Sequence, residues 1–433
     1  MMAILMVGLL IPLMMILGLV SERATRRSAV TQEVSSQWGG AQTIIGPVLS
    51  VEFRTRTTGF DGKPAFNSDR AAFSPTALQI TAEAVPERRS RGLFEVIVYR
   101  SRLKLTGRFQ PPDFSRWRVL SEDVVRSTAT ISVGLSEPRG IVAPLALNWD
   151  GQEQKFVPGT PDIAIGVAGI SSTVVLPDQE RDIPFEITLE VNGTRDLRFT
   201  PMGNETMVQL SSAWPHPGFI GAPLPQERRV TSAGFTSTWN VPYYGRSFPA
   251  SWSVVTINRD QHAQAIANAS FGVSLVRPVD IYQQSERAVK YAALFIVMTF
   301  VIAFLWEIIH GAPVHPVQYV FIGFALCVFY LLLLAASEHV GFDRAYVSAA
   351  TANIALIAWY WTWVIRSGAR HGVLMGMVLS ALYGYLYLLL RLEDYSLLAG
   401  AVGLFVMLAA VMFLTRKIDW YTLRIGREGA GTR

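Results

Sequence analysis

Five apolar runs in the C-terminal third of the chain constrain its fold more than any other feature. Each run is 18–21 residues long, and short polar segments separate them. At about 1.5 Å rise per residue, a helical run of this length matches the ~30 Å hydrocarbon core of a bilayer. The runs are Tyr291–Ile309, Pro316–Ala336, Tyr346–Ile365, Val373–Leu390 and Ser396–Leu414. The pattern therefore predicts a block of five transmembrane helices.

The N-terminal residues form a sixth apolar run. Met1–Val20 lacks a small-x-small cleavage site and a basic leader, which predicts an uncleaved signal anchor, with a cleaved signal peptide as the alternative. Beyond it, the apolar residues Val30, Val34 and Trp38 recur at helical spacing. We therefore expect the helix to continue as an amphipathic juxtamembrane segment until it reaches Gly40.

Between these membrane segments the hydrophobic pattern changes to period two. Thr43–Phe53 and Leu93–Phe109 alternate apolar and polar residues, which is typical of half-buried β-strands. Asn192-Gly193 lies between two such runs and predicts a two-residue hairpin. Helical segments of 10–15 residues do not alternate with these strands, so we expect antiparallel rather than parallel pairing.

The predicted fold class is an α-helical membrane bundle of six transmembrane helices, one plus five, with a large antiparallel all-β extracytoplasmic domain inserted between helices 1 and 2. The expected domains are an N-terminal anchor (1–22), a juxtamembrane amphipathic helix (23–40), a periplasmic β domain (41–279), a five-helix bundle (280–415) and a basic cytoplasmic tail (416–433).

The charges that flank the spans predict the orientation. The tail carries five basic residues, which are Arg416, Lys417, Arg424, Arg427 and Arg433. Such an excess is typical of a cytoplasmic segment, and counting spans back from the tail puts the β domain outside, in the periplasm. Arg23, Arg26 and Arg27 follow the anchor and favour the inverted orientation. We prefer the first orientation because long domains translocate largely regardless of charge.

Composition narrows the function classes. The single cysteine, Cys327, lies in an apolar run, so neither a disulfide framework nor a cysteine metal site is expected. The basic residues are scattered, which argues against nucleic acid as a partner. HExxH, G-x-S-x-G, Walker A and G-x-G-x-x-G motifs are missing, and the six histidines show no close pair at ligand spacing. We therefore expect no metal, no cofactor, no catalytic residues and no enzymatic activity.

Ionisable residues near the ends of the spans are candidates for function. The candidates at the outer rim of the bundle are Glu338, His339, Asp343, Arg391, Glu393 and Asp394. The candidates at the inner side are Glu307, His310, His315 and Gln318. The inner cluster resembles a metal or proton-relay grouping, although polar groups at helix ends also reach interfacial water without any such role. At the outer rim we expect Arg391 to pair with Glu338 or Asp343.

Two further patterns have both a functional and a structural interpretation. An aromatic loop contains Trp214, His216 and Phe219, and it is either a binding loop or a rigid turn around a packed tryptophan. Small residues recur at four-residue spacing on the fifth span, at Gly372, Gly376, Ser380 and Gly384. This spacing favours close helix packing, either within the bundle or between protomers of a homo-oligomer.

Several segments, in order along almost the full length of the chain, resemble the CreD family of bacterial inner-membrane proteins. They include Trp38–Val48, Leu135–Gly140, Ser211–Pro217, Phe271–Asp280 and Glu286–Tyr291. The resemblance implies an inner-membrane protein linked to cell-envelope integrity, colicin tolerance and a regulon that touches the β-lactam response. It offers no catalytic residues that could be carried over to this chain.

The sequence thus favours a membrane protein that supports the cell envelope by binding. Besides the lipid bilayer, its expected partner is an envelope protein, a lipid or a peptidoglycan ligand held by the β domain. The first alternative is a transporter that handles lipids or small molecules. The second is a membrane hydrolase on the outer face that uses Glu338, His339 or Asp394.

Overall fold

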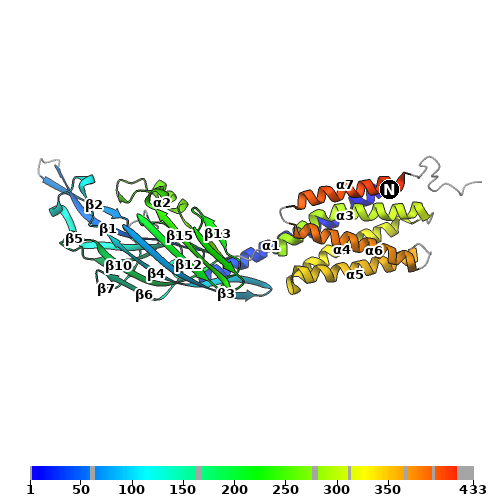
Figure 1. Cartoon of the computed structure of the whole chain (residues 1–433), viewed down its shortest axis with the longest axis horizontal. Coiled ribbons are helices and arrows are strands. Elements are labelled where there is room, and N and C mark those ends of the chain that lie inside the picture. The colour runs from blue at the N-terminus through cyan, green and yellow to red at the C-terminus, as the bar shows by residue number, and fades with distance from the viewer. Residues whose placement is uncertain are drawn as a thin grey trace, which may run out of the picture. The chain divides into compact units, whose positions relative to one another are not determined.

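The structure, a computed structural model, describes residues 2–58, 64–161, 165, 168–275, 281–310, 314–364, 369–392 and 395–416. The chain forms two compact units. The helical unit comprises Met1–Arg26 and Val279–Arg433, and the sheet unit comprises Arg27–Pro278. Figure 1 shows the strands gathered in the sheet unit and most of the helices in the helical unit.

Seven α-helices lie within the described residues. They are α1 (Met2–Trp38), α2 (Arg259–Asn268), α3 (Ile281–His310), α4 (Pro316–Val340), α5 (Phe342–Val364), α6 (Ala369–Arg391) and α7 (Ser396–Thr415). The anchor and the juxtamembrane segment thus form one helix, α1. Five of the seven helices, α3 to α7, follow the last strand along the chain, whereas α2 lies between β16 and β17.

The predicted count of six transmembrane helices is wrong. Within the described residues, four helices are long and apolar enough to cross a membrane. They are Ile4–Trp38, Ile281–Ile309, Pro316–Val340 and Ala369–Arg391. The prediction counted the aromatic residues of α5, such as Trp359 and Trp363, as fully apolar, although tryptophan is amphipathic. In α7 the described residues provide a shorter apolar stretch, Leu398–Phe413.

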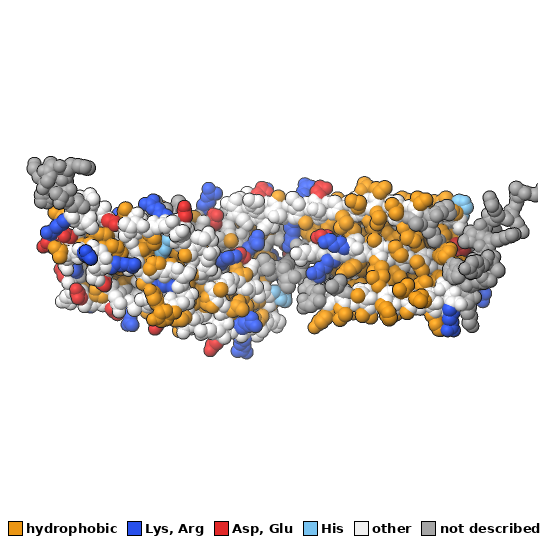
Figure 2. Space-filling view, turned by 90° about the horizontal axis from the view of Figure 1, so that it is seen from above, with side chains coloured by type: hydrophobic (Ala, Val, Ile, Leu, Met, Phe, Trp, Pro, Cys, Tyr) orange, Lys and Arg blue, Asp and Glu red, His pale blue; other side chains and the backbone are white. Residues whose placement is uncertain are grey.

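Apolar side chains cover much of the face of the helical unit that Figure 2 shows. Phe405 and Met412 on α7 and Trp363 on α5 are exposed, whereas Phe300 and Phe329 are fully buried among the helices. Because lipid tails are as apolar as these exposed side chains, such a surface is compatible with a bilayer rather than with water.

The sheet unit contains a nine-stranded sheet in the order β13-β17-β11-β1-β5-β9-β8, with β2 paired to β1 and β16 paired to β2. Its strands are β1 (Gln42–Thr58), β2 (Pro64–Phe73), β5 (Val124–Leu135), β8 (Val157–Pro158), β9 (Gly169–Val174), β11 (Asp196–Phe199), β13 (Gly218–Gly221), β16 (Ser251–Ser253) and β17 (Phe271–Ser274).

A second sheet has eight strands in the order β14-β15-β12-β3-β4-β10-β6-β7. Its strands are β3 (Ala77–Arg91), β4 (Phe94–Phe109), β6 (Ile141–Trp149), β7 (Gln152–Gln154), β10 (Ile183–Thr194), β12 (Glu205–Ser212), β14 (Glu227–Thr231) and β15 (Gly234–Pro242).

Both sheets are mixed, so the predicted antiparallel all-β domain is also wrong. β1 pairs with β11 in parallel, with Gln42 opposite Leu197, and β3 pairs with β12 in parallel, with Ala77 opposite Glu205. The prediction excluded parallel pairs because it found no helical crossovers. In this chain, each pair of parallel strands is instead joined by a long connection that contains other strands. Such a connection is long enough to bring the second strand back in the same direction as the first.

One hydrophobic core joins the two sheets. β4 alternates as expected, because Arg100, Arg102 and Lys104 are exposed while Leu103 and Leu105 are buried. The buried residues of the other sheet, from β1, β5 and β9, belong to the same core cluster. The two sheets therefore stabilise each other by burying their facing apolar side chains.

The predicted hairpin at Asn192-Gly193 does not form. Both residues continue β10, where they pair with Arg100 and Tyr99 of β4. The turn comes later, at Arg195, which has a positive φ of 63°, and the chain then crosses to the other sheet. A Cβ atom at Gly193 would lie 2.4 Å from the ring of Tyr99. The glycine therefore serves close packing rather than a turn.

The C-terminal part of α1 packs on the second sheet. The indole Nε1 of Trp38 donates a hydrogen bond to the Tyr99 carbonyl at 3.3 Å. The guanidinium of Arg89 lies over the Trp38 ring at 3.6 Å, and the Ser35 hydroxyl lies 2.8 Å from that of Thr194. Side chains near the end of α1 are thus part of the sheet unit.

The buried histidine of α2 predicts a loss of stability in acid. His262 packs against Trp252 with ring centroids 4.5 Å apart, and burial lowers its pKa. The unfolded chain, with an ordinary pKa of about 6.5, therefore binds the proton more readily than the folded chain. The contribution of His262 to stability should be constant above about pH 6.5 and fall as the pH drops below it.

Hydrogen exchange of α2 in the full-length protein, measured between pH 7.5 and 5, checks this expectation. His262→Gln should flatten the pH dependence of α2 opening, whereas His216→Gln, at an exposed position, should leave it unchanged. An unaltered pH dependence in His262→Gln would contradict the assignment.

Candidate functional site

Glu338, a candidate of the outer rim, is paired within the helical unit. The Arg23 Nε of α1 donates to Glu338 Oε1 at 2.8 Å, and a second Arg23 nitrogen binds the other carboxylate oxygen. The Tyr282 hydroxyl of α3 donates to Oε1 at 2.9 Å. The side chain of Glu338 is 6% exposed and that of Arg23 is 27% exposed. Glu338 thus links α4 to α1 and α3.

Arg391 pairs with Asp343, not with Glu338. Arg391 Nη2 lies 2.7 Å from Asp343 Oδ2, and both side chains are 54% exposed. The Tyr387 hydroxyl donates to Asp343 Oδ1 at 3.1 Å and accepts a hydrogen bond from Arg391 Nη2 at 2.8 Å. The rim candidates therefore form two separate groups. Of the remaining members, His339 is exposed at the end of α4, and Glu393 and Asp394 lie outside the described residues.

The inner candidates whose side chains the structure describes bind neighbouring groups of the protein. Glu307 accepts a hydrogen bond from the Tyr319 hydroxyl at 2.8 Å. His315 is the N-cap of α4, and Gln318 Oε1 accepts from the His315 backbone N–H at 2.8 Å, which completes a capping box. The side chain of His310 lies outside the described residues. Across the described part of the chain, groups of three or more His, Cys, Asp or Glu residues that could hold a metal ion are absent.

The aromatic loop has the geometry of a packed turn. Trp214 is buried, and its indole Nε1 donates to the His216 carbonyl at 3.0 Å. Phe219 of β13 contacts Phe235 and Trp239 of β15 edge to face, with centroids 6.0 Å apart. Of Trp214, His216 and Phe219, only His216 is exposed.

The small residues of the fifth predicted span pack partly within the bundle. A Cβ atom at Gly372 of α6 would lie 2.7 Å from the Ala358 carbonyl oxygen of α5, and one at Gly376 would touch the Ala358 side chain at 3.4 Å. Nothing lies within 4 Å of a Cβ placed at Gly384. Gly372 and Gly376 therefore allow α5 and α6 to approach each other.

A cavity of about 430 Å³ in the sheet unit was not predicted. Three segments line it: the loop that follows β4, the first residues of β5, and residues 176–183, which lead into β10 and include its first residue. Its charged residues are Asp113, Arg126, Glu180 and Arg181. These residues form no motif in the sequence, and only the fold brings them together.

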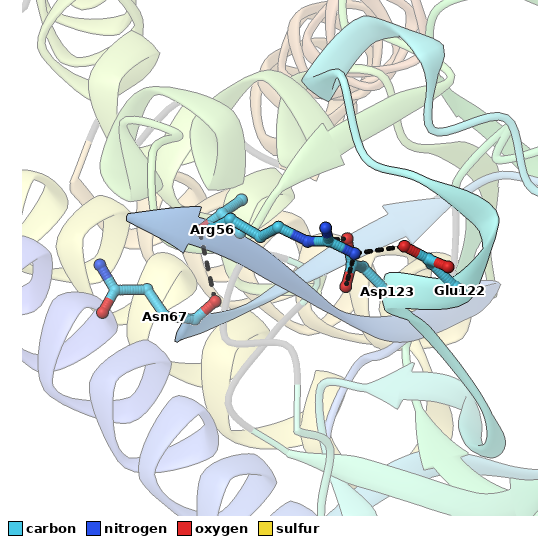
Figure 3. Close-up of polar contacts among 5 residues, drawn as sticks. Arg56, Asn67, Glu122 and Asp123 are labelled. Atoms are coloured by element: carbon cyan, nitrogen blue, oxygen red, sulfur yellow. Dashed lines mark hydrogen bonds and ion pairs between the residues drawn. The ribbon is translucent and has the colours of Figure 1, made fainter. Parts of the chain in front are cut away.

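The loop that follows β4 is held in place at both ends. Phe114 packs edge to face on Phe53 and Phe73, with centroids 5.7 and 5.3 Å apart. At the other end lies the short helix η2 (Ser121–Asp123), where Asp123 Oδ2 accepts from Arg56 Nε of β1 at 3.1 Å. Figure 3 shows Arg56 reaching from its strand to both Glu122 and Asp123.

Two charged residues of the cavity lining, Asp113 and Arg181, are held in place by hydrogen bonds. Asp113 accepts a hydrogen bond from the Ser115 backbone N–H at 2.8 Å, and its bonds to Ser115 hold the pKa of the carboxyl below its usual value. Arg181 Nη1 donates to Asp150 Oδ1 at 2.8 Å, so that its charge is paired. A cavity of this volume that contains polar groups held in place resembles a small-molecule site in those two respects.

The buried ion pair of α1 and α4 yields an asymmetric prediction. Arg23→Gln should cost about 3 kcal/mol, because it leaves the Glu338 carboxylate buried without its cation. Glu338→Gln should cost less, since Arg23 is partly exposed, and the double variant should be more stable than Arg23→Gln alone. Thermal unfolding in detergent measures all three variants.

The exposed pair provides the matched control. Asp343→Asn should change stability by only about 0–1 kcal/mol, because the Asp343–Arg391 pair is well solvated. Additive losses in the Arg23 and Glu338 double variant would show that the two residues do not interact.

Comparisons with known proteins agree on one family. A family model described as inner membrane protein CreD matches residues 1–421. The inner membrane protein CreD of Escherichia coli (strain K12) is 30% identical over 428 residues, which cover 98% of this chain and 93% of that protein.

Solved structures offer only weak likeness. An M1 zinc metallopeptidase from Deinococcus radiodurans matches with a TM-score of 0.20 at 11% identity, covering 41% of this chain and 44% of that chain. Native yeast LTA4 hydrolase matches with a TM-score of 0.20 at 9% identity, covering 67% of this chain and 52% of that chain. Scores this low support no conclusion about the fold or the activity of this chain.

Proposed function

The chain belongs to the CreD family of inner membrane proteins, and from that membership we propose that it supports cell-envelope integrity by binding an envelope component through its sheet unit. The sheet unit faces the periplasm in this proposal, and the C-terminal tail is cytoplasmic. The basic residues of the tail support this orientation. The protein acts as a binding protein rather than as an enzyme.

The observation that carries the proposal is the cavity in the sheet unit. Its volume of about 430 Å³ lies within the range of about 300–1,000 Å³ that is usual for small-molecule sites. Aromatic packing at Phe114 and the ion pairs of Arg56 hold its walls, so a ligand would meet a preformed surface. The rim candidates Glu338, Asp343 and Arg391 bind one another or neighbouring helices instead, which favours a structural role for them.

Blocking the cavity tests the proposed function in cells. Deletion of the gene should increase the sensitivity of the host to membrane-active detergents, and the wild-type chain should restore resistance. Ser121 is an exposed residue that lines the cavity, so Ser121→Trp should fill it and fail to restore resistance.

The matched control is Ser90→Trp, at an exposed position of β3 that does not line the cavity, and it should restore resistance at the same protein level. Unchanged detergent sensitivity on deletion would refute the role in envelope integrity. Full rescue by Ser121→Trp would refute the role of the cavity.

Surface labelling tests the proposed orientation. Tyr244 is 94% exposed in the sheet unit, whereas the native Cys327 is buried. In a Cys327→Ala background, Tyr244→Cys should react with a membrane-impermeant maleimide on spheroplasts with intact inner membranes. Labelling only after the inner membrane is permeabilised would place the sheet unit in the cytoplasm.

A further inference from the structure

Three of the four charged residues that line the cavity have no oppositely charged partner within the described residues; only Arg181 has one, in Asp150. Asp113 is nevertheless held by hydrogen bonds to Ser115. In the part of the chain that the structure describes, Arg126 meets no carboxylate, and Glu180 has neither a cation nor a hydrogen bond. The cavity therefore presents one cation without a counterion, Arg126, and one carboxylate that makes no bond to the described residues, Glu180.

Arg126 is fixed in position but retains unused donors. Its backbone carbonyl accepts from the Leu176 N–H at 3.1 Å, and its Nη1 donates to the Pro177 carbonyl at 3.1 Å. A guanidinium carries five N–H donors in a planar fork. Because only one of these bonds is made within the described residues, Arg126 keeps the capacity to bind a carboxylate.

Glu180 belongs to a turn that its neighbour holds. The Arg181 N–H donates to the Gln179 carbonyl at 3.0 Å, while the Arg181 guanidinium is anchored on Asp150. The turn thus keeps Glu180 at the cavity wall with its side chain exposed. A carboxylate in this position can accept hydrogen bonds from an ammonium group, and no existing ion pair has to be broken first.

Most of the uncharged residues that line the cavity are apolar in type. Phe114, Leu176 and Ile183 are buried side chains that line the cavity, together with Pro111, Pro112 and Pro177. The formal charges of the lining cancel, since two residues are acidic and two are basic. A simple anion would face an uncompensated Glu180, and a simple cation would face an uncompensated Arg126. A ligand that carries both charges satisfies both residues.

We propose that the cavity binds a short peptide with free ends, its carboxylate at Arg126, its ammonium at Glu180 and its apolar side chains against the half-buried prolines Pro111, Pro112 and Pro177. This assignment rests on the proposed binding function and specifies the class of ligand. It requires no chemical step, because the peptide is bound and released unchanged.

Titration calorimetry of the full-length protein in detergent tests the ligand first. Leucyl-leucine should bind at least about tenfold more tightly than N-acetyl-leucyl-leucine, which lacks the ammonium, and than leucyl-leucine amide, which lacks the carboxylate. The L,L and D,D isomers distinguish a protein-derived peptide from one of cell-wall type. The proposal would be overturned if leucyl-leucine and its capped forms bound equally, or if neither the L,L nor the D,D isomer bound. This test uses the wild-type protein alone.

Two variants test the assignment of the ends. Arg126→Gln should bind leucyl-leucine and its amide equally, and Glu180→Gln should bind leucyl-leucine and its N-acetyl form equally. Glu180 is exposed, so its variant is expected to fold, and thermal unfolding verifies this for both variants. Arg228→Gln, on the exposed strand β14, should bind as the wild type does. Wild-type discrimination in both cavity variants would overturn the assignment.

The two proposals fail in different ways. If the deletion strain is sensitive to detergent and Ser121→Trp does not rescue it, but peptides do not bind, the envelope function stands and the peptide assignment falls. If peptides bind as expected while deletion leaves the envelope intact, the assignment of the ligand stands and the envelope function falls.

Discussion

The buried carboxylate of Glu338 imposes a constraint on which the arrangement of the helical unit depends. An ionised group that is 6% exposed must be paired and hydrogen-bonded, because its desolvation is otherwise prohibitive. Its two partners come from different helices, Arg23 from α1 and Tyr282 from α3. Arg23 thus provides the counterion for Glu338, which lies 315 positions later in the chain. α1 therefore has a structural role, since α4 needs its cation.

A second constraint shapes the sheet unit, where each strand must pair its backbone groups and bury one face. The chain satisfies both requirements with two mixed sheets over one core. β1 illustrates how this works, because it pairs with β5, β2 and β11 along different parts of its length. Long connections between parallel neighbours are then unavoidable. One such connection includes the loop that follows β4 and the start of β5, and these segments form two walls of the cavity.

The sequence predicted the type of each segment better than the way in which the segments associate. Apolar length identified the membrane helices, and period-two alternation identified strands such as β4. The count of spans was wrong at α5, whose tryptophans were taken as apolar, and at α7, whose described residues provide only a shorter apolar stretch. Parallel pairing was missed because strand patterns do not reveal which strands become neighbours. The hairpin at Asn192-Gly193 was wrong because a glycine selected for packing against Tyr99 resembles a turn glycine.

The site was harder to predict than the fold, and the reason is physical. Residue type drew attention to Glu338, Asp343 and Arg391, yet the structure shows that these charges are satisfied by one another or by neighbouring helices. A charge whose bonds are all made internally stabilises the fold and has little left to offer a ligand. Arg126 and Glu180 attract no attention in the sequence, because they belong to no motif and lie 54 positions apart. They differ from the rim residues because, within the described residues, neither has an oppositely charged partner. The sequence does not reveal this property, whereas the structure does.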